Sequence, residues 1–105
     1  MNRVTLTATT LEVKPVRYTP AGVPVLEILL QHQSQVTEAG TQRLIDMTLP
    51  GIALGDIAIM LSDTPLGASL TINGFLAPAK KGASKLVLHF QTVTRNTVGN
   101  DPVTV

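Results

Sequence analysis

The sequence contains no cysteine, no tryptophan and little charge. Of its 105 residues, 14% are Asp, Glu, Lys or Arg and 3% are aromatic. The lack of cysteine excludes disulfides, thiol nucleophiles and cysteine-ligated zinc, and it suits a reducing compartment. Eight basic residues oppose seven acidic ones, for a net charge of +1, so no whole-molecule field attracts nucleic acid. Any basic function must therefore be local.

Long apolar runs are also missing. The opening residues, MNRVTLTATT, contain no apolar run of the signal-peptide type after Arg3. The apolar runs elsewhere fall far short of the roughly 18 to 20 residues that a membrane span requires. We therefore expect a soluble, cytoplasmic protein without membrane contact. Because 44% of the residues are hydrophobic, we expect one folded core and a sparsely charged surface that an oligomer could cover.

Five segments have the alternating, β-branched character of strands. They run from Val4 to Val13, from Val23 to about Gln35, and over residues 43–50, 68–77 and 85–94. In the second segment, Val25 and its period-two partners are expected to face inward, which makes Glu27 a polar exception. Turns are expected around Gly22 and Gly40.

The segment 51–67 fits either an alternating strand or one short helix packed on the core, and both alternatives stay open. Five strands with short turns, and at most one helix between the third and fourth, predict an all-β, five-stranded OB-fold, which is a Greek-key barrel. A β-sandwich is the rival, although its seven strands are hard to find. We expect residues 1–95 to form this domain and residues 96–105 to be a loosely held tail.

Side chains suited to catalysis are few. His32 and His89 lie on expected strands, outside any metal-binding spacing, and are interpreted as structural or surface residues. The carboxylates are scattered, and no GxSxG, GxGxxG or GxxxxGK[ST] motif occurs. The sequence therefore predicts no enzyme, no metal site and no cofactor.

The basic residues are better organised. In an OB-fold, the first-to-second and fourth-to-fifth strand loops flank the face of strands two and three that binds oligonucleotides. The basic residues expected on or around this face are Lys14, Arg17, Arg43, Lys80, Lys81 and Lys85. Cations in such a position release counterions from phosphates and gain affinity without reading bases. The plainer interpretation of the lysine-rich turn is a solvated loop that protects a sheet edge.

Aromatic side chains matter because each stacked base contributes roughly 1–3 kcal/mol in single-strand binding. Phe75 and Phe90 are expected in the core, which leaves Tyr18 as the best stacking candidate. DNA binding by this face should therefore depend on charge and weaken steeply with salt.

The segments NRVTLTATT, VRYTPAGVPVLEILLQHQS, EAGTQR and INGFLAPAKKGASKLVLHFQTV resemble the primosomal replication protein N family, usually called PriB. The resemblance runs from Asn2 to Thr94, and its most specific parts are TPAGVPVLEILLQHQS and GFLAPAKKGASKLVLH. The related single-stranded DNA-binding proteins share the OB-fold and are the natural alternative.

The resemblance implies a homodimer that binds single-stranded DNA in the replication-restart primosome and assists a PriA-type helicase without catalysis. The positions that it implies as DNA contacts are Arg17, His32, Arg43, Lys80, Lys81 and Lys85. The sequence departs from the family at Gln33, where members have a basic residue, and at Thr41 and Asp46, where some have aromatics.

Two further functions stay open beside DNA binding. The protein could be mainly an interaction module that docks on the helicase and binds DNA weakly, or a structural barrel without a nucleic-acid role. The strand Val4–Val13 is the expected dimer interface, because pairing two such edges would extend one sheet across the dimer.

Overall fold

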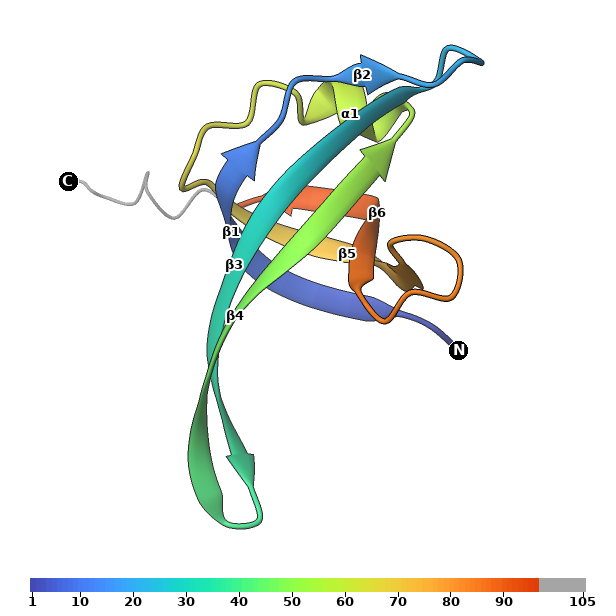
Figure 1. Cartoon of the computed structure of the whole chain (residues 1–105). Helices are drawn as coiled ribbons and strands as arrows, with labels where there is room; N and C mark the ends of the chain where they lie inside the picture. Colours follow the sequence, from blue (N-terminus) through green and yellow to red (C-terminus); the bar gives the residue numbers. More distant parts are fainter. Residues whose placement is uncertain (97–105) are drawn as a thin grey trace, which may run out of the picture.

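The computed structural model describes residues 1–96, in which strands wrap into a barrel (Figure 1). The strands are β1 (Val4–Val13), β2 (Arg17–Tyr18), β3 (Pro24–Glu38), β4 (Thr41–Leu54), β5 (Ser69–Pro78) and β6 (Leu86–Arg95), and the helix is α1 (Asp56–Met60). No helix in residues 1–96 has the length and hydropathy to cross a membrane.

The barrel closes because β1 pairs on both sides. The sheet order is β1-β5-β6-β4-β3-β2, and an additional β1–β3 pairing joins its ends. All of these pairings are antiparallel except β4–β6. Five strands closed in this order, with a short helix between β4 and β5, form the OB-fold that the sequence predicts, and the two-residue β2 is an addition within the expected first loop.

The inner face of β3 differs from the prediction. Leu26, Ile28 and Leu30 belong to the core, with 0–2% of their surface exposed. Glu27 is half-buried on the opposite, outer face, so the expectation that it lies on the inner face is wrong, although Val25 is buried as expected, with 2% of its surface exposed. Side chains alternate along a strand, but the apolar residues of this segment occupy both faces and hide the alternation.

The segment 51–67, for which the sequence left a strand and a short helix open, contains both. Residues 51–54 extend β4 past Pro50, where the sequence predicted that the strand ends, and α1 follows. Pro50 is tolerated because β6 pairs with β4 only from Gly51 onward. Gly51 is required by packing, since a Cβ there would lie 2.6 Å from Cε1 of Phe90.

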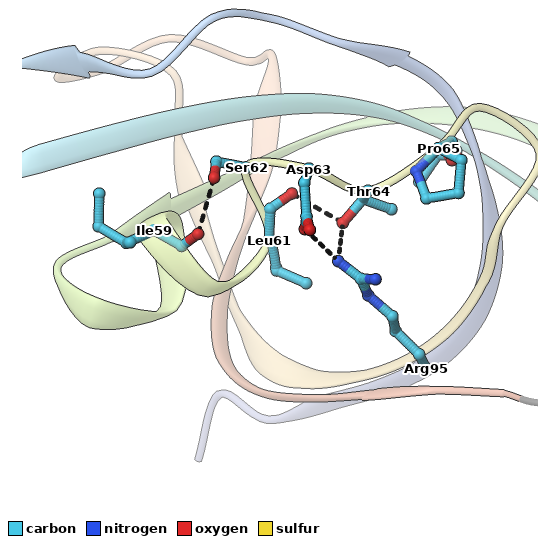
Figure 2. Close-up of polar contacts among 8 residues, drawn as sticks. Ile59, Leu61, Ser62, Asp63, Thr64, Pro65 and Arg95 are labelled. Carbon is cyan, nitrogen blue, oxygen red and sulfur yellow. Dashed lines mark hydrogen bonds and ion pairs between the residues drawn. The ribbon is translucent and has the colours of Figure 1, made fainter.

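The connection from α1 to β5 is held by polar contacts to β6 (Figure 2). Arg95 Nη2 lies 2.9 Å from Asp63 Oδ1 and 2.9 Å from Thr64 Oγ1, and the Thr64 hydroxyl donates to the Leu61 carbonyl at 2.7 Å. The hydrogen bond and charge of Arg95 lower the pKa of Asp63 below its usual value. The loop is therefore fastened to the last barrel strand.

The β3–β4 hairpin extends well beyond the barrel (Figure 1). Its strands pair from Val25 and Leu54 to Glu38 and Thr41, so the turn has only two residues. Both of these residues, at positions 39 and 40, have positive φ angles, of 51° and 79°, as the tight turns of two-residue hairpins require. The predicted turn at Gly40 is confirmed, but both strands are longer than predicted.

The strand β1 is only partly an exposed edge. Residues 4–9 pair with β5 and residues 9–13 pair with β3. Within the described residues, two edges of β1 have no strand beside them, that of Val4–Ala8 facing away from β5 and that of residues 10–13 facing away from β3. The second is partly covered, because Thr10 exchanges backbone hydrogen bonds with Gly67 and Ala68. The expected dimer edge is therefore narrowed to the first half of β1. The predicted tail after residue 96 lies outside the described residues.

Candidate functional site

A row of side chains crosses four strands on the outer face of the barrel. Glu27 on β3 pairs with Ile52 on β4, Ile52 pairs with His89 on β6, and His89 pairs with Phe75 on β5. Paired residues project from the same side of a sheet. We call these four residues the outer row. The row lies on the face of the barrel that the two basic loops flank.

Three basic side chains gather around Glu27 at one end of the outer row. Arg17 donates from Nη2 and Nε to Glu27 Oε2 at 3.0 and 3.3 Å. Lys14 Nζ lies 3.8 Å from Glu27 Oε1. Lys85, Glu27 and Pro50 line two shallow hollows, of about 160 and 270 Å³, and Glu12 also lines the smaller one. We call Lys14, Arg17, Lys85 and Glu27 the Glu27 cluster.

The loop between β5 and β6 carries the other two lysines of this face. Ala79 N–H donates to the Lys85 carbonyl at 2.8 Å and Ala83 N–H donates to the Lys80 carbonyl at 2.9 Å. Gly82 has a φ of 78°, which fits the third position of a type II turn. The turn leaves Lys80 and Lys81 exposed, and neither forms an ion pair with another residue in the described part of the chain. We call residues 79–85 the lysine loop.

Tyr18 follows Arg17 on the short strand β2. Its residue exposure is 62%, and it pairs with Pro24 at the start of β3, whereas Arg17 pairs with Val25, so the two side chains project from opposite sides of β2. The following turn is closed by the Gly22 N–H, which donates to the Thr19 carbonyl at 2.8 Å. The ring is therefore exposed on a hydrogen-bonded hairpin, as a stacking residue should be.

His32 and Arg43 lie apart from this group. In the β3–β4 register they pair with Met47 and Val36, on the same side as the core residues of β3. His32 Nδ1 donates to the Thr7 carbonyl at 2.6 Å. Arg43 forms an ion pair with Glu38 at 2.7 Å, near the tip of the protruding hairpin. The expectation that Arg43 joins the other basic residues on one face is therefore wrong.

The outer row contains an aromatic pair that the sequence pattern did not predict. The rings of Phe75 and His89 stack with centroids 4.8 Å apart and an interplanar angle of 13°. Both side chains are half-buried, so the prediction that Phe75 is a core residue is wrong, whereas Phe90 is buried as predicted. Alternation with the buried Leu70 and Ile72 of β5 is the sequence signal that places Phe75 outside.

Together, the Glu27 cluster, the outer row and the lysine loop form a cationic surface with two half-buried rings. Such a surface can hold an extended polyanion whose flat groups stack on the rings. Within residues 1–96, no three His, Asp or Glu side chains gather closely enough to hold a metal ion.

An OB-fold barrel with basic loops around its outer face has the layout of a single-strand-binding protein. The model of a family described as "Another single-strand binding protein family" matches residues 2–92. Replication restart protein PriB of Bordetella pertussis is 48% identical over 105 residues, which cover 98% of each chain. The chain belongs to the PriB family of replication restart proteins.

Solved structures agree with this assignment. PriB from Ralstonia solanacearum superposes with a TM-score of 0.81 at 37% identity, covering 90% of this chain and 97% of that one. The single-stranded DNA binding protein of Thermus aquaticus gives a TM-score of 0.73 at 25% identity, covering 91% of this chain and 50% of that one. Both matches confirm the predicted OB-fold.

Proposed function

We propose that this protein binds single-stranded DNA along the outer row, as a non-catalytic accessory factor that assists a PriA-type helicase in the replication-restart primosome. The lysine loop and the Glu27 cluster contact phosphates, and Tyr18 and the Phe75–His89 stack contact bases. The names of the relatives support this proposal, since they are a replication restart protein and a single-stranded DNA binding protein. We expect the protein to act in the cytoplasm.

The observation that carries the proposal is the meeting of two basic loops at one face. Lys14 and Arg17 come from the β1–β3 connection, and Lys85 comes from the end of the lysine loop. Segments this far apart in sequence meet around Glu27 because the β3–β4 and β4–β6 pairings bring them together. Phosphates spaced along a single strand would meet cations from both loops.

Fluorescence anisotropy with labelled oligo-dT tests the proposal. We expect binding at about 50 mM salt that weakens several-fold by about 200 mM, because each contacted phosphate contributes roughly 0.7 to the salt slope of a single strand. A duplex of equal length should bind more weakly, since its bases cannot stack on exposed rings. Absence of oligo-dT binding at low salt would overturn the proposal.

We further infer that the working form is a homodimer. The unpaired edge of Val4–Ala8 could pair with the same edge of a second copy and join two sheets into one. Sedimentation equilibrium at micromolar concentration tests this, with a dimer as the expected species. A pure monomer under these conditions would contradict it.

A second candidate function is docking on the helicase with only weak DNA binding. The observation that favours it is the exposed apolar surface of the protruding hairpin, where Val36, Leu44 and Met47 are 45%, 78% and 39% exposed. Exposed apolar side chains on a projecting element are typical of protein contacts. A pull-down with the helicase after nuclease treatment separates the two functions, because a protein contact survives the loss of DNA.

A further inference from the structure

Glu27 is a carboxylate within the proposed DNA face, at one end of the outer row. Its Oε2 atom already accepts two hydrogen bonds from Arg17, and its Oε1 atom lies 3.8 Å from Lys14 Nζ. Lys85 lines both of the hollows that Glu27 lines. A phosphate that approaches these three cations therefore meets a negative charge that is already paired with two of them.

The backbone fixes Glu27 in this position. β3 pairs with β1 as far as Ile28 and with β2 at Val25, so Glu27 lies at the junction of the two pairings. The Lys14 N–H donates to the Glu27 carbonyl at 3.0 Å, which keeps the start of the β1–β2 connection beside the side chain. With 38% of its side chain exposed, Glu27 can be reached by anions from solution.

We propose that Glu27 is an internal competitor of phosphate, which pairs with Arg17 and Lys14 in the free protein and so limits the affinity of this face for DNA. The inference rests on the proposed function for its ligand. Exposed ion pairs of this kind are weak, so a phosphate can replace the carboxylate at these cations. DNA binding at this end of the row is then an exchange of anions, which releases fewer counterions than unpaired cations would release.

The variant Glu27→Gln tests the competitor, because it keeps the size of the side chain and removes its charge. We expect its affinity for oligo-dT at about 50 mM salt to rise about three- to tenfold, since two cations become available. The slope of log affinity against log salt should steepen by up to about 1.4, which corresponds to two more phosphate contacts on a single strand. An unchanged melting temperature would show that the variant is folded.

The matched control is Asp56→Asn, which makes the same change of charge at an exposed residue of α1. It should leave affinity and salt slope nearly unchanged. Equal gains in the two variants would overturn the inference, because net charge alone would then explain them.

The coupling between Glu27 and Arg17 gives a second test. Arg17→Gln should reduce DNA affinity more in the Glu27→Gln background than in the wild type, because in the wild type a phosphate reaches Arg17 only by displacing Glu27. If Glu27 instead orients Arg17 for DNA, Glu27→Gln weakens binding and the coupling has the opposite sign. That result would also overturn the inference.

A titration with tripolyphosphate beside the oligo-dT titration separates this inference from the proposed function. If the wild type binds no DNA while Glu27→Gln gains affinity for either polyanion, the proposed function fails and the competitor stands. If the wild type binds DNA and the variant binds no tighter, the proposed function stands and the competitor fails. If neither protein binds either polyanion, both fail.

Discussion

The two loops that flank the outer row carry their basic residues in opposite states. In the first loop, Lys14 and Arg17 are held against Glu27. In the lysine loop, Lys80 and Lys81 project from a turn and form no ion pair with another described residue. The number of basic residues on a face therefore overstates the charge that a phosphate meets, since part of it is already compensated.

The largest effect is expected from a substitution that displaces the β5–β6 hairpin, which carries the lysine loop. Gly74 adjoins a β-bulge, and a Cβ there would lie 1.8 Å from the backbone oxygen of His89. Gly74→Ala should lower the free energy of unfolding by about 3 kcal/mol, because backbone rather than a side chain must move. Thermal or urea denaturation measures this.

The same substitution at Gly67 serves as the control for Gly74→Ala. Gly67 has a φ of 82°, and a Cβ added there would meet nothing within 4 Å beyond its chain neighbours. Gly67→Ala should cost only about 1–2 kcal/mol, from backbone strain. Equal losses at the two sites would contradict the close approach of β5 and β6 at Gly74.

The second-largest effect is expected from removing the positive charges that no described carboxylate pairs with, those of Lys80 and Lys81. Changing Lys80 and Lys81 together to Ala should weaken oligo-dT binding about tenfold at low salt and flatten the salt slope by up to about 1.4. The effect should be the same for any base sequence, since phosphates carry no sequence information. The double change to Arg keeps the charge and should keep most of the affinity. A full loss in that control would indicate a role other than charge.

A smaller effect is expected at the compensated end of the face. Arg17→Gln in the wild type should weaken oligo-dT binding by no more than about twofold, because Glu27 already pairs with this side chain. Lys81→Gln, measured in the same anisotropy assay, should cost more. If Arg17→Gln lowers oligo-dT affinity as much as Lys81→Gln does, pairing with Glu27 does not reduce the contribution of Arg17 to DNA binding.

The smallest effect concerns an ion pair away from the outer row. Asp63→Asn frees Arg95 at the α1–β5 connection, and DNA affinity should not change. Because Arg95 lowers the pKa of Asp63, this pair contributes stability that is present above the ordinary pKa of the carboxyl and is lost as the pH falls through its lower, folded value. Melting temperatures from about pH 5 down to pH 2 should therefore fall slightly less in the variant. Tighter DNA binding by Asp63→Asn would show that freeing an arginine anywhere on the surface raises DNA affinity, and the effect would then not be specific to the outer row.

The strand pattern of this protein could be predicted where one face is polar. In β1, Thr5, Thr7 and Thr9 alternate with residues that face the barrel, and the bounds of the strand, Val4–Val13, are those expected. In β3, apolar residues lie on both faces, so Glu27 was assigned to the wrong side. The turn chemistry at Gly22 and Gly40 was informative because each has a positive φ that few other residues adopt.

The composition of the candidate site could be predicted only in part. The two basic loops follow from the order of elements in an OB-fold. The pairing of Glu27 with Arg17 and Lys14 depends on the register between β1, β2 and β3, which no local pattern specifies. The placement of Arg43 depends on how far the hairpin extends past the barrel, and this length is set by tertiary pairing rather than by the turn.

The closure of the barrel has a consequence for the emerging chain. Val4 on β1 pairs with Gly74 on β5, seventy residues later, so the first strand is synthesised long before its partner exists. At about 5–20 residues per second, this wait lasts roughly 4 to 14 s. During that time β1 has only the end of β3 to pair with, and its threonine-rich edge is open to other chains. The barrel can therefore close only after β5 and β6, the last two strands, have been synthesised.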